Sequence, residues 1–174
     1  MPADPAVDVW SAGIIMLSLM TGRYPFFIAS DDMNALYEIR CIFGREAMQA
    51  AGLQLGACSG PCRIDPSVRS PTDGNGAMPP WLRAVVERRM YEGDAGIVPE
   101  PFLTKSGGVD WRLFVETVNP EARGRYSDYA YDLLNQCLQL DPARRITALA
   151  AQRHPYLAPK IVPRDQTVTV PRDL

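Results

Sequence analysis

The sequence predicts a mainly α-helical fold that contains a loop-rich insert, and three observations carry this prediction. Two strongly helical blocks lie near the ends of the chain, at about 8–21 and about 128–155. Between them, eleven of the 13 glycines and half of the 16 prolines fall within 44–127. Glycine and proline favour turns over regular elements, so we expect many loops in this insert.

The first block is predicted to be a core helix at about 8–21. Its apolar residues fall on every face of the helical period, and such a helix is buried in a protein core or in a membrane. The run is shorter than the roughly 20 residues that span a bilayer, which favours the protein core. A membrane-associated protein using Val7 to Met20 is the weaker alternative.

Both ends of this helix carry signals. Asp8 is the only charge between Val7 and Gly22 and is predicted to be the N-cap. Gly22 is placed to end the helix in a left-handed conformation, and Pro25 turns the chain away. A second helix is expected at about 32–43 and ends before Gly44. Its apolar side is predicted to comprise Leu36, Ile39 and Phe43.

Within the insert at 44–127, two further helices are expected, at about 80–92 and about 109–118. Cys58 and Cys62 form a C-x-x-x-C pair, but zinc needs four ligands and His154 is the only histidine of the chain. We therefore predict two loop thiols and no metal residues.

The last two helices are predicted within about 128–155. Apolar residues recur with helical spacing until Asp141 and Pro142 stop the first of the two. Thr147 is the expected N-cap of the second helix, and Ala150 stands where a capping box would place glutamate. The polar tail at 158–174 is expected to be loosely held.

Composition excludes some functions. The formal net charge is −2, from 18 basic and 20 acidic residues, which gives no electrostatic footprint for nucleic acid or anionic lipid. We therefore expect no direct nucleic-acid partner and no membrane. Four cysteines and no signal peptide favour an intracellular, reducing compartment.

Two blocks also carry a family resemblance. The stretches DVWSAG at Asp8–Gly13 and GRYPFF at Gly22–Phe27 resemble the central helix of the large lobe of eukaryotic protein kinases. The block at Asp128–Leu157 resembles the last two helices of that lobe, with the L-D-P-x-x-R-I-T-A and H-P-[FY] signatures. The turn YPFFIASDD is most similar to the cell-division-cycle-seven (Dbf-dependent) kinases, and casein-kinase-two-like kinases are the nearest competitor. The expected domain is a partial kinase domain spanning 1–174.

The resemblance implies a function for the parent family. It implies ATP-dependent phosphorylation of serine and threonine with magnesium, the replicative MCM helicase as protein substrate, a Dbf-type regulatory subunit as partner, and the nucleus as location. The helix at about 32–43 would be the docking-type helix, and the insert would contribute to partner engagement. A plain surface helix and a solvated loop are the alternatives.

The motifs of the phosphotransfer reaction are not found in the sequence. There is no H-R-D, D-F-G or A-P-E, so the chain is expected to begin just after them. We expect no catalytic or cofactor-binding residues and no activity from this chain alone. The second hypothesis is a non-catalytic binding module that presents the 32–43 helix and the insert to a regulatory subunit.

Four residues match structural positions of the family. The aspartate at the Asp8 position accepts hydrogen bonds from the catalytic loop in the family, and here its N-cap role would remain. Trp10 and Gly13 are expected to be packing residues, and Gly13 should permit the close approach of another helix. Arg145 matches the arginine that pairs with the A-P-E glutamate. Without that glutamate, we expect Arg145 to be exposed or solvated.

Overall fold

The computed structural model describes residues 4–29, 32–56, 102–104 and 107–158. The predicted mainly α fold is confirmed, and the one β-bridge of these residues pairs Leu103 with Val109. The predicted helix at about 80–92, the Cys58 and Cys62 pair and the tail from 159 lie outside the described residues. The elements are α1 (Pro5–Thr21), α2 (Asp32–Phe43), α3 (Arg45–Gln54), α5 (Trp111–Val118), η2 (Pro120–Ala122), α6 (Asp128–Cys137), η3 (Pro142–Arg144) and α7 (Ala148–Gln152).

Helix α1 begins earlier than predicted, so the prediction that Asp8 is the N-cap is wrong. Asp4 is the N-cap, and its Oδ1 accepts a hydrogen bond of 2.9 Å from the Ala6 N–H. Pro5 occupies the first helical position, where its missing N–H leaves no bond unmade. Asp8 lies in the first turn, where its charge is favourable to the helix dipole. Gly22 ends the helix with φ 66°, as predicted.

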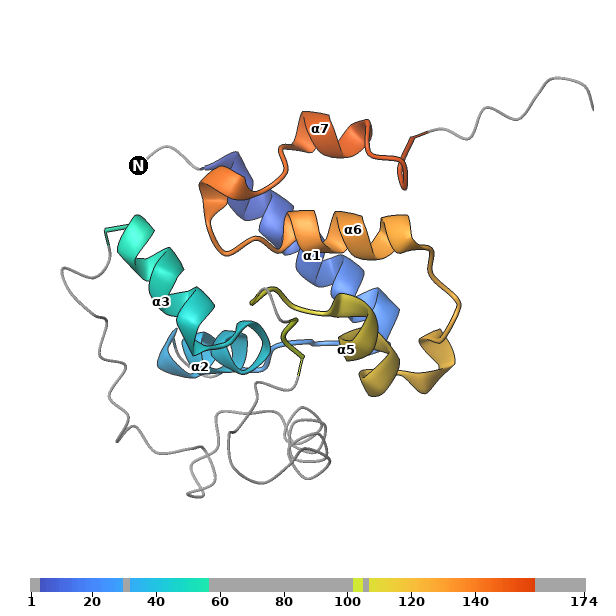
Figure 1. Cartoon of the computed structure of the whole chain (residues 1–174), viewed down its shortest axis with the longest axis horizontal. Helices are drawn as coiled ribbons and strands as arrows, with labels where there is room; N and C mark the ends of the chain where they lie inside the picture. The colour runs from blue at the N-terminus through green and yellow to red at the C-terminus, as the bar shows by residue number, and fades with distance from the viewer. Residues whose placement is uncertain (1–3, 30–31, 57–101, 105–106, 159–174) are drawn as a thin grey trace, which may run out of the picture.

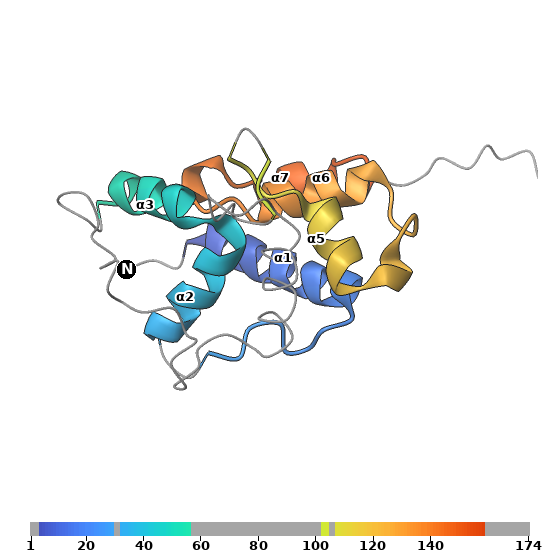
Figure 2. The ribbon, with the colours of Figure 1, turned by 60° about the horizontal axis from the view of Figure 1, so that its bottom comes forward.

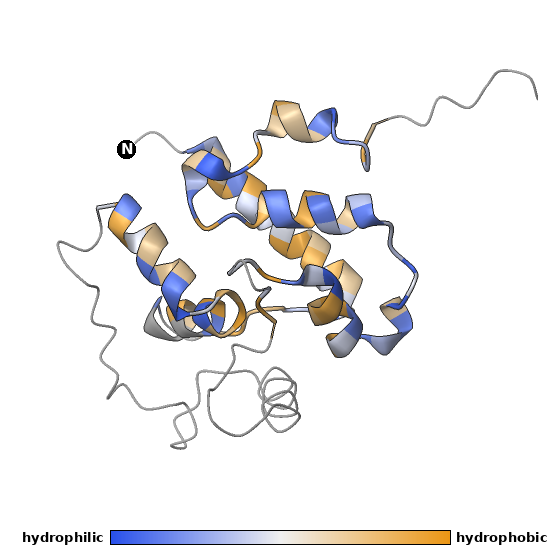
Figure 3. Ribbon diagram, viewed as in Figure 1, coloured by the Kyte–Doolittle hydropathy of each residue, from blue (hydrophilic) through white to orange (hydrophobic). Residues whose placement is uncertain are grey.

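Helix α1 runs through the middle of the fold, with α5 and α6 packed on it (Figures 1 and 2). Its buried side includes Val9, Gly13 and Leu17. On the other side, Ile15 is 61% exposed and Leu19 is 74% exposed. Most residues of α1 are apolar (Figure 3), and they occur on all sides of the helix, as predicted, but the described residues cover only part of them. No helix among the described residues is long and apolar enough to cross a membrane.

Helix α2 has the predicted bounds, and Gly44 follows it with φ 84°. Its buried side differs from the prediction because Leu36 is 38% exposed, whereas Glu38 is fully buried. Helix α3 follows directly and was not predicted. Its apolar residues are mostly alanines, which give a weak periodic signal.

The insert contributes to the core as well as to loops. Helix α5 lies within the predicted range of about 109–118, and the Asp110 carboxylate caps it by accepting from the Leu113 N–H at 2.9 Å. The Phe114 ring packs edge-on against Phe102 at a centroid distance of 4.8 Å. Trp111 packs similarly against Phe43 of α2 at 5.5 Å. The second contact joins the insert to α2.

The last helices follow the predicted order. Helix α6 ends at Cys137, so it stops before Asp141 and Pro142, which form the start of η3. Thr147 is the N-cap of α7, as predicted, and its hydroxyl accepts a hydrogen bond of 3.2 Å from the Ala150 N–H.

Candidate functional site at the start of helix α1

Arg145, which follows η3, ties two distant segments together through backbone carbonyls. Its Nε and Nη2 donate to the Gln139 carbonyl at 2.9 and 2.8 Å. Its Nη1 donates to the Ala6 carbonyl at 2.6 Å. The guanidinium thus holds the first turn of α1 against the segment between α6 and η3. Hydrogen bonds from a charged donor are stronger than neutral ones, which makes this a firm attachment.

Trp10 forms the apolar part of the same junction. The guanidinium carbon of Arg145 lies 5.0 Å from the centroid of the Trp10 ring, a cation–π geometry. Trp10 also packs against Phe43 of α2, with the ring centroids 5.6 Å apart. One continuous set of contacts therefore joins η3, α1 and α2, consistent with the packing role expected for Trp10.

The prediction that Arg145 would be exposed or solvated is wrong. The residue is half-buried, and burial lowers its pKa, while the Asp4 and Asp141 carboxylates act in the opposite direction. Guanidinium remains protonated in proteins, so the charge persists. Main-chain carbonyls satisfy the guanidinium in place of the glutamate carboxylate that the family resemblance implies. Carbonyl positions depend on the fold, and no sequence motif reports them.

Gly13 lies at a close approach between α1 and the end of α6. A Cβ added at Gly13 would lie 2.7 Å from Leu138 Cδ2 and 3.0 Å from Cys137 Cβ. The close approach expected from the sequence is therefore present. Burial raises the pKa of the neighbouring Cys137 thiol, which keeps it neutral, as suits a core residue.

The chemistry of this junction is structural. Asp8 is exposed, and its carboxylate makes no hydrogen bond with the described residues. No group of three or more histidine, cysteine or acidic residues among the described residues could hold a metal ion. The Arg145 guanidinium is occupied and the Cys137 thiol is neutral. The arrangement can fix where α1 begins.

Comparison with known proteins decides the family. The model of the protein kinase domain matches residues 1–157. This chain belongs to the protein kinase family. The match includes the α1 block and the α6 to α7 block that carried the resemblance.

Among curated kinases, the chain is similar to the cell-division-cycle-seven group, which confirms that narrower resemblance. It is 35% identical to the human "Cell division cycle 7-related protein kinase", over 87% of this chain and 30% of that protein. It is 33% identical to the fission yeast "Cell cycle serine/threonine-protein kinase hsk1", over 88% of this chain and 25% of that protein. The chain thus spans less than a third of the length of these relatives.

Two polar residues of this kinase chain, Glu38 and His154, are buried, which was not predicted from the sequence. Glu38 Oε2 accepts a bond of 3.2 Å from the Ile28 N–H, while its buried Oε1 has no hydrogen-bond partner among the described residues. His154 Nε2 lies 3.0 Å from Asp132 Oδ2, and His154 Nδ1 accepts from the Tyr156 N–H at 3.2 Å. The bond from His154 lowers the pKa of Asp132.

These contacts also determine which ring nitrogen of His154 carries the proton. Because Nδ1 of His154 accepts a hydrogen bond, its proton lies on Nε2 and points to the Asp132 carboxylate. The pair joins α6 to the turn after α7. No periodic pattern could have found it, because the two residues lie on different elements and both are polar.

Proposed function

We propose that this chain supplies the central and last helices of the large lobe of a cell-division-cycle-seven-type Ser/Thr kinase. The proposed reaction is ATP-dependent phosphorylation of a protein substrate, the replicative MCM helicase, in the nucleus. The observation that carries this proposal is the match of residues 1–157 to the protein kinase domain. The similarity to the human and fission yeast kinases supports the narrower group.

Within that kinase, this chain would act as scaffold. Phosphoryl transfer needs groups that cover the phosphates, bind magnesium and orient the acceptor hydroxyl. The sequence contains no H-R-D or D-F-G, and the described residues hold no ligand cluster that fits magnesium. We propose that residues other than the described ones bind ATP and magnesium. The contribution of Arg145 and Trp10 would be to fix the start of the central helix on which such a site rests.

The test combines binding and catalysis. Titration calorimetry of the 174-residue chain with ATP and magnesium should show no saturable heat. Adding a kinase segment that contains H-R-D and D-F-G should restore phosphorylation of an MCM substrate peptide. Saturable micromolar ATP binding by the chain alone would overturn the scaffold assignment. Failure of the combined segments to phosphorylate any serine or threonine peptide would overturn the kinase assignment.

A binding role is the second candidate, and one observation favours it. Leu36 on α2 is 38% exposed, although Ile39 on the same helix packs against the core. A Dbf-type regulatory subunit could cover this position. Leu36→Glu should then reduce capture of that subunit, whereas Leu149→Glu, at a 61% exposed position on α7, should not. Equal capture of the subunit by both variants would show that the binding surface does not include this position of α2.

A further inference from the structure

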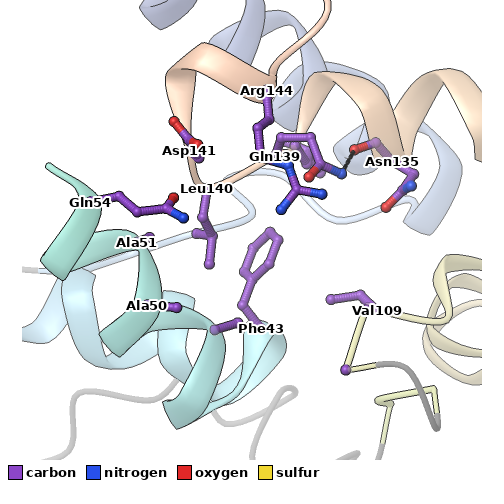
Figure 4. Close-up of a pocket in the computed structure, with 14 residues that line it drawn as sticks. Phe43, Ala50, Ala51, Gln54, Val109, Asn135, Gln139, Leu140, Asp141 and Arg144 are labelled. Atoms are coloured by element: carbon purple, nitrogen blue, oxygen red, sulfur yellow. Dashed lines mark hydrogen bonds between the residues drawn. The ribbon is translucent and has the colours of Figure 1, made fainter.

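A cavity of about 330 Å³ lies between α3, the end of α2 and the segment from α6 to η3 (Figure 4). Neither Arg145 nor Trp10 lines it, although Phe43 and Gln139, which contact these two residues, do. Its volume lies at the low end of the roughly 300–1,000 Å³ that ligand pockets occupy. The space suits one or two side chains better than a nucleotide.

The apolar part of the cavity is built from rings and small side chains. Phe43 and Leu140 face it, and α3 contributes the methyl groups of Ala47, Ala50 and Ala51. Alanine side chains are short, so α3 leaves space that a larger residue would fill. An apolar side chain placed there would cover the exposed carbon atoms.

Arg144 supplies an available charge at this cavity. It is exposed, its guanidinium reaches into the cavity toward the Phe43 ring, and this guanidinium has no hydrogen bond or ion pair with the described residues (Figure 4). Three other polar side chains of the lining already have hydrogen bonds. Asp141 Oδ1 accepts from the Ala143 N–H at 2.9 Å, Gln139 Nε2 donates to the Asn135 carbonyl at 2.9 Å, and Asn135 Oδ1 accepts from the Trp111 indole at 3.2 Å.

We propose that this cavity binds a short segment of a partner protein in which a large apolar side chain is followed by an acidic residue. The apolar side chain would pack on Phe43, Leu140 and the alanines of α3. The carboxylate would pair with the Arg144 guanidinium, whose planar fork matches a carboxylate.

Charge complementarity favours this occupant over a phosphate compound. Among the described residues, Arg144 is the only cationic one that lines the cavity, and the Asp141 carboxylate lies on the same rim. The Arg144 guanidinium beside the Asp141 carboxylate leaves little net positive charge to bind a multiply charged phosphate. A ligand with a single carboxylate needs only the paired N–H donors of one guanidinium. The proposal does not depend on the kinase assignment, because it rests on the cavity alone.

The test uses the full chain and a fluorescein-labelled synthetic peptide that contains Phe-Glu between glycine and serine residues. Matched peptides carry Phe-Gln or Ala-Glu. Fluorescence polarisation should show the Phe-Glu peptide binding tightest. Arg144→Gln should weaken that binding about tenfold, because a charge-assisted bond is lost. Ala51→Leu should abolish it by filling the cavity.

The control variants carry the same two types of substitution, placed on α7 and on the residue that follows it. Arg153→Gln and Ala148→Leu change exposed residues away from the cavity and should bind as the unchanged chain does. Equal binding of the Phe-Glu and Phe-Gln peptides, or no binding at all, would overturn the proposal. Displacement of the peptide by inorganic phosphate as readily as by free Phe-Glu peptide would also overturn it.

A second measurement needs no variant and covers the case in which Ala51→Leu disturbs folding. A spin label on the Phe-Glu peptide should broaden the backbone amide signals of 47–54 and 139–144 in the unchanged chain. Broadening confined to other residues, such as the exposed side of α1, would place the peptide elsewhere and contradict the proposal.

Discussion

The guanidinium of Arg145 lies over the ring of Trp10, with 5.0 Å between the guanidinium carbon and the ring centroid. The same guanidinium donates to the carbonyls of Ala6 and Gln139. One side chain therefore joins the first turn of α1 to a segment more than a hundred residues later. This relationship gives the kinase chain a fixed start for its central helix.

Replacing Arg145 tests this junction. Arg145→Lys keeps the charge but loses the planar group that reaches two carbonyls and stacks on Trp10. We expect the free energy of unfolding to fall by about 2 kcal/mol, measured by urea denaturation. Arg144→Lys, on the exposed neighbour, should change it by less than about 0.5 kcal/mol. Equal effects at the two positions would show that the contacts of Arg145 contribute little.

Gly13→Ala should destabilise the chain even though alanine is the better helix former. The new Cβ would lie 2.7 Å from Leu138 Cδ2, which forces α1 and α6 apart. Overpacking of this kind costs about 1–3 kcal/mol, which exceeds the gain in helix propensity of about 1 kcal/mol. Thermal denaturation of Gly13→Ala beside Ser11→Ala, at an exposed position of the same helix, checks this. A stabilised Gly13→Ala variant would contradict the close contact.

Glu38→Gln should stabilise the chain at neutral pH. Burial raises the pKa of Glu38 above its ordinary value, with a smaller opposing effect from the Ile28 N–H. The folded chain therefore holds this proton more tightly than the unfolded chain, and stability is lost as pH rises through the raised pKa. Glutamine cannot ionise but can still accept from Ile28, so we expect a gain of about 1 kcal/mol at pH 7.

Measuring the free energy of unfolding of Glu38→Gln over a range of pH shows whether the gain in stability comes from the charge. The difference from the unchanged chain should disappear below the ordinary glutamate pKa, where both forms are neutral. Glu46→Gln, an exposed residue of α3, should show no such dependence. A gain that stays constant from acid to neutral pH would assign the effect to packing rather than charge.

The uncovered side of α1 should govern self-association. Ile15 and Leu19 are 61% and 74% exposed, so replacing both with glutamine removes apolar surface without opening the core. Sedimentation velocity should show less association, and the free energy of unfolding should change by less than about 1 kcal/mol for the pair. Leu17→Gln, at a 1% exposed position of the same helix, should instead unfold the chain. If the double variant associated as much as the unchanged chain, the self-association surface would lie elsewhere.

The sequence by itself determined the helical fold class, the bounds of α2, the Gly22 and Thr147 caps and the family. These features are local, because helical period, capping side chains and short motifs act within a few residues. The predicted N-cap of α1, Asp8, was wrong, because the helix begins at Pro5 after Asp4. The pair Asp4 and Pro5 would have signalled that start.

Only the tertiary structure decided the partners of Arg145, the burial of Glu38, the His154 and Asp132 pair and the cavity beside Arg144. Each depends on groups that are far apart in the chain. The partners of Arg145 are carbonyls, which every residue carries, so no residue type marks them in advance. The cavity exists because the short alanine side chains of α3 face Phe43 and Leu140 across a gap, and the width of that gap follows from packing.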